Sequence, residues 1–70
     1  MNMISTPESS NISCYGYDEV GQMLRVEFRN GTIYDYFDVP SHIFDEMQHS
    51  GSKGSYLAQN IKGRFRYARA

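Results

Sequence analysis

The stretch from Met23 to Phe37 constrains the fold most, because it holds two alternating runs of residues joined by Asn30-Gly31. An Asn-Gly pair between alternating runs is the strongest short-range signal for a β-hairpin. The sequence therefore predicts two antiparallel strands here, connected by a turn at these two residues.

The side chains of this hairpin predict its register. A two-residue turn pairs Val26 with Asp35 and mixes charged with apolar residues on both faces, whereas a three-residue loop over residues 29–31 pairs Val26 with Tyr34. With the longer loop, one face carries Leu24, Val26, Phe28, Tyr34 and Tyr36, and the other carries Arg25, Glu27 and Asp35, with Ile33 and Phe37 as apolar exceptions. Because a one-residue slip exchanges the faces, we expect the longer loop, with Gly31 in the left-handed conformation of a bulge.

Length and cysteine content bound the class of protein. Seventy residues predict one small domain, and a single cysteine, Cys14, excludes a disulfide framework. The sequence shows no secretory signal and no apolar stretch of membrane-spanning length. Since a lone cysteine is typical of a reducing compartment, we expect a cytoplasmic protein with no membrane partner.

The residues before the hairpin predict a tail and one further strand. Residues 1–9 lack periodicity, which predicts a flexible N-terminal tail ahead of a single domain over residues 10–70. Ile12 to Tyr17 alternates, with two tyrosines on one side and Ile12 and Cys14 on the other, and the sequence leaves open which side faces inward. Short links between three consecutive strands favour an antiparallel meander.

Two short helices are predicted after the hairpin. Pro40 opens the first, since proline is favoured at the first helical position, and Gly51 is expected to cap it in a left-handed conformation. The second runs from about Lys53 to Lys62, with Ser52 as N-cap. The expected fold is α+β, a three-stranded meander with both helices packed on one face. Residues 64–67 either add a short fourth strand at the C-terminus or pack one side against the core.

Positive charge is concentrated at the C-terminus. Residues 53–70 carry five Lys or Arg and no acid, a formal charge of +5, whereas residues 1–52 carry eight acids and two arginines, a formal charge of −6. Such a split can mark a surface for an anionic partner. A basic tail that pairs with the acidic remainder of one small fold explains the same split, and this ordinary explanation is favoured.

The predicted start of the second helix is the main candidate binding site. Free N–H groups and the positive end of the helix dipole hold phosphates well. The candidate phosphate ligands are Ser52, Lys53, Gly54 and Ser55, and Lys62, Arg64 and Arg66 would extend the charged surface. The order of residues does not match a P-loop, so nucleotide hydrolysis is not implied. An ordinary turn between two helices explains the same residues and is favoured.

Three tyrosines are candidates for stacking unpaired bases: Tyr34, Tyr36 and Tyr67. The predicted register places the first two on the face covered by the helices, so core packing is the favoured role for both. For metal binding, His42 and His49 lie about 10 Å apart along one helix, too far for one ion to take both. We predict no catalytic residue, no metal ligand and no cofactor.

The ordered set of motifs resembles the KTSC domain family. The resemblance covers Ser9 to about Tyr67 and rests on Gly16-Tyr17-Asp18, Leu24-x-Val26-x-Phe28-x-x-Gly31, Tyr34-x-Tyr36, Val39-Pro40, Ser52-Lys53-Gly54-x-Tyr56 and Ile61-x-Gly63. This small domain occurs alone in bacteria and phages and at the carboxyl end of some lysyl-tRNA synthetases. The resemblance implies no established activity, and RNA binding is suggested by the synthetase attachment.

The leading hypothesis is a small non-catalytic binding module for a phosphate-bearing partner, with RNA as the first choice. One alternative is a protein-interaction or inhibitor module, for which Met23, Ile33 and Phe37 would form an exposed apolar face. Another is a pocket for a nucleotide-like small molecule at residues 52–55. The sequence does not predict the oligomeric state.

Overall fold

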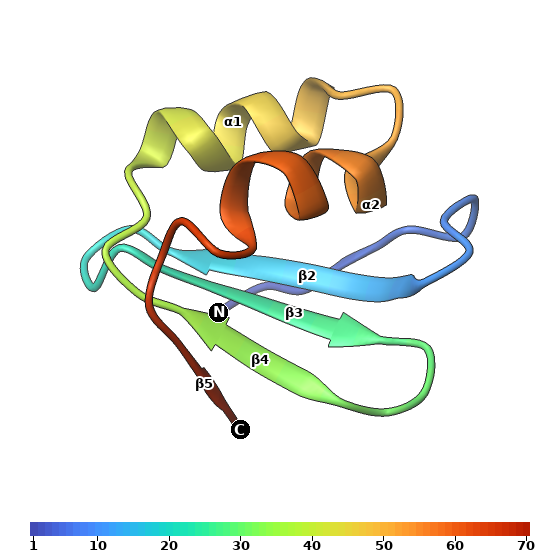
Figure 1. Ribbon diagram of the computed structural model, residues 1–70, viewed down its shortest axis with the longest axis horizontal. Coiled ribbons are helices and arrows are strands. Elements are labelled where there is room, and N and C mark those ends of the chain that lie inside the picture. The colour runs from blue at the N-terminus through green and yellow to red at the C-terminus, as the bar shows by residue number, and fades with distance from the viewer.

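The computed structural model describes residues 1–70 as two layers, an antiparallel sheet with helices on one face (Figure 1). The five strands lie in chain order: β1 (Ile4–Ser5), β2 (Ile12–Asp18), β3 (Met23–Phe28), β4 (Ile33–Tyr36) and β5 (Tyr67–Arg69). The helices are α1 (Ser41–His49) and α2 (Lys53–Tyr56), which continues as the π-helical segment η1 (Leu57–Ile61). The α+β class and the β2–β3–β4 meander are confirmed. None of the helices combines the length and apolar character that crossing a membrane requires.

The predicted number of strands was too low. β1 forms within residues 1–9, where we predicted a flexible tail, and Ile4 and Ser5 pair with Tyr15 and Cys14 of β2. β1 is two residues long, so it has no alternating pattern of its own that a sequence could display. Of the two alternatives for residues 64–67, the structure has the strand at the C-terminal edge of the sheet, but this strand, β5, begins at Tyr67.

The central hairpin has the predicted register and loop. Val26 pairs with Tyr34, and Leu24 pairs with Tyr36. The Phe28 N–H donates to the carbonyl oxygen of Thr32 at 2.8 Å, and the Gly31 N–H donates to the carbonyl oxygen of Phe28 at 2.9 Å. Gly31 has a φ of 90°, the conformation that glycine adopts at no steric cost, so the bulged three-residue loop is confirmed.

The inner face of β2, which the sequence left open, depends on a bulge. The register shifts between Ile12 and Cys14, so that Ile12 pairs with Phe28 and Tyr15 pairs with Val26. One extra residue in the strand therefore turns both Ile12 and Tyr15 toward the helices, where both are buried. Strict alternation had placed these two side chains on opposite faces.

The first helix begins and ends slightly differently from the prediction. Pro40 has a ψ of 151° and precedes the helix instead of forming its first residue. Gly51 does not cap it, because no left-handed residue follows α1. Instead, the N–H and the hydroxyl of Ser50 both donate to the carbonyl oxygen of Met47, at 3.2 and 2.8 Å.

The second helix begins as predicted and then widens. The Ser52 hydroxyl oxygen accepts a hydrogen bond from the Ser55 N–H at 3.3 Å, which confirms the N-cap. The Lys62 N–H donates at 2.8 Å to the carbonyl oxygen of Leu57, five residues earlier, so the last turn is π-helical. Gly63, with a φ of 78°, ends the helix in the left-handed region.

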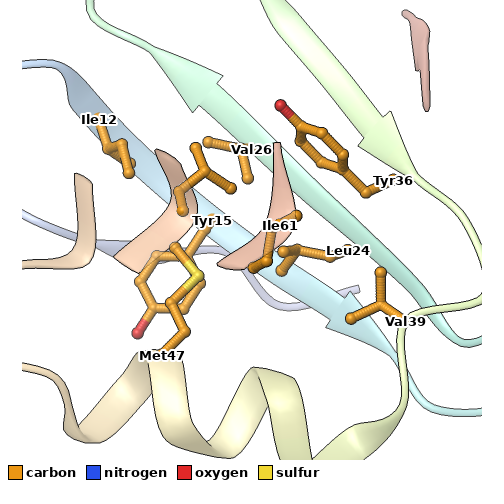
Figure 2. Close-up of a cluster of buried hydrophobic side chains, with 9 residues drawn as sticks. Ile12, Tyr15, Leu24, Val26, Tyr36, Val39, Met47 and Ile61 are labelled. Carbon is orange, nitrogen blue, oxygen red and sulfur yellow. The ribbon is translucent and has the colours of Figure 1, made fainter. Parts of the chain in front are cut away.

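A single apolar core fills the space between the sheet and the helices (Figure 2). Its nine buried residues are Ile12, Tyr15, Leu24, Val26, Tyr36, Val39, Met47, Leu57 and Ile61. Full burial of one aliphatic side chain contributes about 1.5–3 kcal/mol, so this cluster holds the two layers together. Tyr36 is 2% exposed and belongs to the core, whereas Tyr34 is only half-buried at its margin.

Candidate functional site

Two adjoining hollows share Ser10 and Asn11 of the N-terminal loop. In the ribbon, the N-terminal loop before β2 and the start of α2 lie on the same side of the molecule (Figure 1). The first hollow has a volume of about 430 Å³. Its lining comes from the N-terminal loop and the turn between the helices: Thr6, Glu8, Ser9, Ser10, Asn11, Gly51, Ser52, Lys53, Gly54, Ser55 and Ala58. Only one of these 11 residues is hydrophobic, so the first hollow offers hydroxyl, amide and backbone groups to a ligand.

All four residues predicted at the start of the second helix line the first hollow. The Lys53 ammonium forms no ion pair, and the backbone N–H groups of Lys53 and Gly54 form no hydrogen bond. The Ser55 N–H is already taken by the Ser52 hydroxyl. An anion here would therefore meet Lys53 and two backbone N–H groups, with Glu8 as the one acid in the lining.

Gly54 also has a packing role. A Cβ at this position would lie 2.5 Å from Oδ1 of Asn11, whereas a Cβ at Gly51 would meet nothing within 4 Å. The missing side chain of Gly54 thus lets α2 approach the Asn11 side chain closely.

The second hollow has a volume of about 450 Å³ and shares Ser10 and Asn11 with the first. Its lining comes from the end of β3, the hairpin loop and the end of the second helix: Ser10, Asn11, Phe28, Arg29, Asn30, Thr32, Tyr34 and Lys62. Two of the predicted site residues, Tyr34 and Lys62, are therefore brought together here. Asn11 therefore borders both the hollow that contains Lys53 and the hollow that contains Lys62.

Aromatic rings form one wall of the second hollow. The rings of Phe28 and Tyr34 meet edge to face, with centroids 5.8 Å apart, and Tyr67 packs on Tyr34 at 5.6 Å. The Lys62 Nζ lies over the Phe28 ring, 5.5 Å from its centroid. Tyr36 is buried under these groups and presents no face to a ligand, and its pKa is raised by burial.

The N-terminal wall of both hollows is held by Arg29. Its guanidinium donates to the carbonyl oxygens of Ser9 and Thr6, each at 2.8 Å. Thr6 is fully buried, and its hydroxyl donates to the carbonyl oxygen of Ile12 at 2.6 Å. The serine-rich segment is thus tied to the sheet by side chains that are distant in sequence.

Several residues of the site were missed from the sequence. They are Ser9, Ser10, Asn11, Phe28, Arg29, Asn30 and Thr32. All seven lie within the stretch that resembles a known family, but the resemblance gave none of them a binding role. The position of the first three beside α2 depends on long-range contacts, which local periodicity does not encode.

Four predicted site residues line neither hollow: the tyrosines Tyr36 and Tyr67, and the arginines Arg64 and Arg66. Arg66 pairs with Asp38 at 3.2 Å, and its guanidinium carbon lies 5.5 Å from the centroid of the Phe37 ring. Arg64 is exposed, forms no ion pair and lines neither hollow. The structure therefore does not bring these arginines together with Lys53.

The face of the sheet opposite the helices is divided by charge. Arg25 and Asp35 form a two-point ion pair across β3 and β4, with N–O distances of 2.7 and 3.0 Å. This pair lies between Ile33 at one end and Met23 and Phe37 at the other. The three apolar residues that we predicted as one exposed face are separated by it.

A hydrogen bond joins the two helices beside the first hollow. The Tyr56 hydroxyl donates to Oε1 of Glu46 at 2.7 Å. Desolvation, followed by this hydrogen bond and the charge of Glu46, raises the pKa of Tyr56 to about 12. No group of three or more His, Cys, Asp and Glu side chains is close enough to hold a metal ion.

Comparison with known proteins identifies the family. The model of the KTSC domain matches residues 8–65. The chain belongs to the KTSC domain family. The predicted resemblance is therefore confirmed, over nearly the same residues.

The relatives of this KTSC domain include large and small proteins. It is 44% identical over 61 residues to a lysine–tRNA ligase of Nostoc sp., covering 87% of this chain but only 11% of the ligase. It is 39% identical to a protein of Tsukamurella paurometabola, covering 84% of this chain and 88% of that one. The crystal structure of a KTSC domain protein from Yersinia pestis superposes with a TM-score of 0.93 at 30% identity, covering 99% and 96% of the two chains.

Proposed function

We propose that this KTSC domain is a small non-catalytic binding module that takes phosphate groups of RNA in the first hollow. The observation that carries the proposal is the combination of an unpaired Lys53 ammonium with two unpaired backbone N–H groups in a hollow with a polar lining. Backbone N–H groups beside a lysine form a common cradle for phosphate oxygens.

The adjoining second hollow supports a polymeric partner over a single anion. It adds a second unpaired cation, Lys62, and aromatic rings next to the same Asn11 that borders the first hollow. Successive phosphates and bases of one strand require such a series of cationic and aromatic groups. The lysine–tRNA ligases that contain a similar segment have an RNA substrate by name, which favours RNA among phosphate polymers.

A matched pair of charge variants tests this proposal. Lys53→Gln and Arg64→Gln each remove one positive charge, but only Lys53 lines a hollow. We expect Lys53→Gln to weaken binding of a fluorescein-labelled single-stranded RNA pool by about fivefold to tenfold, because a charge-assisted contact to phosphate contributes about 1–1.5 kcal/mol. Arg64→Gln should leave the anisotropy titration nearly unchanged. Equal losses in both variants, or no binding of any RNA by the unmodified chain, would contradict the proposal.

The dependence on salt gives a second readout of the same contacts. Each phosphate contact to a single strand contributes about −0.7 to the slope of log K against log salt concentration. Two contacts, at Lys53 and Lys62, predict a loss of about sevenfold in affinity between about 50 and 200 mM salt. A flat dependence argues for a partner that is not a polyanion.

The two alternative functions receive less support from the geometry. A continuous apolar face would favour a protein-interaction module, and the Arg25–Asp35 ion pair divides the face that we predicted. Size-exclusion chromatography with light scattering addresses self-association. A nucleotide-like small molecule fits either hollow by volume, and thermal-shift screening with free nucleotides separates it from RNA.

A further inference from the structure

The second hollow combines a fixed aromatic wall with a cation that nothing else holds. Phe28 and Tyr34 come from neighbouring strands and are half-buried, and the exposed Tyr67 ring contacts Tyr34 edge to face. The backbone of Lys62 is fixed by its bond to Leu57, but its ammonium forms no ion pair or hydrogen bond and rests on the Phe28 ring. A cation–π contact at an exposed ring is weak, so a planar group can displace the ammonium.

Two asparagine side chains at the rim of the second hollow use their carbonyl oxygens in hydrogen bonds and leave their NH₂ groups unbonded. Oδ1 of Asn30 accepts from the Thr32 N–H at 3.0 Å, and Oδ1 of Asn11 accepts from the Ser9 hydroxyl at 3.1 Å. The amide NH₂ groups of both asparagines form no hydrogen bond, and both side chains line the hollow. Such donors suit the carbonyl oxygens and ring nitrogens at the edge of a nucleobase.

We propose that the second hollow binds one unpaired nucleobase, which replaces the Lys62 ammonium on the face of Phe28. The displaced ammonium then pairs with the phosphate of the same nucleotide. This inference rests on the proposed function and narrows it: the RNA is single-stranded where it crosses the two hollows. A base inside a duplex has both faces stacked and its pairing edge occupied, so it cannot enter.

The ligand chemistry, a base that carries a phosphate, occurs both in single-stranded RNA and in free nucleotides. Because the two hollows share Ser10 and Asn11, a strand can place a phosphate at Lys53 and a base at Phe28 at the same time. A free mononucleotide fills one hollow only and gains nothing from the other. The arrangement therefore favours the strand.

The test compares RNA octamers that differ in the presence of bases. The probes are fluorescein-labelled oligouridine, oligoadenine, a self-complementary duplex, and an octamer of abasic spacers with the same number of phosphates. We expect at least one single-stranded octamer to bind about tenfold or more tightly than the abasic octamer and the duplex, since stacking on an aromatic ring is lost in both. Equal binding of the single-stranded and abasic octamers overturns the base site.

Protein variants assign the effect to the second hollow. Phe28→Leu keeps an apolar side chain but removes the ring, and it should abolish the preference for bases over abasic spacers. Because Phe28 also packs against the core, its fold is checked by circular dichroism, and Lys62→Gln provides an exposed second variant. Lys62→Gln should weaken octamer binding about fivefold while the fluorescence of a 2-aminopurine base in the octamer is still quenched on binding. Unquenched 2-aminopurine with unmodified protein contradicts stacking.

The outcomes separate this inference from the proposed function. If Lys53→Gln weakens binding but the abasic octamer binds as well as the others, phosphate binding stands and the base site is wrong. If uridine or adenosine monophosphate binds as tightly as the octamers, the occupant is a free nucleotide and the single-strand proposal is overturned. If no probe binds, both proposals are wrong.

Discussion

The two ends of the sheet carry the same cation–aromatic contact in different surroundings. At the end with the hairpin loop, Lys62 lies 5.5 Å from the centroid of Phe28. At the opposite end, just after β4, Arg66 lies 5.5 Å from the centroid of Phe37. Arg66 is also paired with Asp38, whereas Lys62 has no anionic partner and borders a hollow of about 450 Å³.

This difference separates a structural contact from a candidate binding contact. The charge of Arg66 is already neutralised by a neighbour, so a polyanion would have to compete with Asp38. The charge of Lys62 is balanced only by a ring face, and the adjoining wall offers unused amide groups. Position in the fold, and not the number of basic residues in the C-terminal segment, therefore distinguishes the two ends.

The largest expected difference between the two ends is in the free energy of unfolding that is lost when an arginine is removed. Arg29→Ala removes two charge-assisted hydrogen bonds that hold the N-terminal loop, and should lower the free energy of unfolding by about 1.5–3 kcal/mol. Arg66→Ala removes one exposed ion pair and should cost about 0–1 kcal/mol. Urea unfolding followed by circular dichroism measures both. Similar losses in the two variants would mean that the loop is not held as described.

A smaller loss of stability is expected when the pH is raised, because the hydrogen bond from Tyr56 to Glu46 that joins α1 and α2 is then lost. The folded chain holds the phenolic proton of Tyr56 more tightly than the unfolded chain, because its pKa rises from 10.0 to about 12. The stabilisation is fully present below pH 10 and is lost as the pH rises through about 12. Since the hydroxyl is exposed and water screens the pair, we expect about 1 kcal/mol.

The control for this pH effect is Tyr56→Phe, which lacks the titrating group. Burial also raises the pKa of Tyr15, Tyr17 and Tyr36, and these remain in the variant, so both proteins should lose stability in alkali. The unmodified chain should lose more between pH 10 and about 12. Parallel stability curves would rule out the Tyr56–Glu46 bond as a stabilising contact.

Sequence patterns predicted the parts of the fold whose causes are local. The hairpin register followed from the separation of charged and apolar side chains, and Gly31 and Ser52 acted as expected at the loop and the helix start. The bulge in β2 was not predictable, because one extra residue exchanges the two faces without changing the composition. β1 was missed because it forms only through pairing with β2, which no pattern within residues 1–9 indicates.

The candidate site was only partly predictable for the same reason. Lys53 and Lys62 belong to one basic segment in the sequence, and the structure places them in two adjoining hollows. Arg66 belongs to the same segment but lies at the other end of the sheet. It precedes β5, which runs antiparallel to β4 and begins beside Tyr36. Arg29 holds the loop of residues 6–11 at the site. Its contacts span about twenty residues of sequence, so no local pattern predicts them.

We propose that single-stranded RNA binds at the hairpin-loop end of the sheet and not at the Arg66 end. An amide chemical-shift titration of the ¹⁵N-labelled chain with the tightest-binding RNA octamer distinguishes the two ends residue by residue. We predict shifts at Asn11, Lys53 and Lys62, and none at Asp38 or Arg66. Shifts centred on Asp38 and Arg66, or on the face that carries the Arg25–Asp35 ion pair, would contradict it.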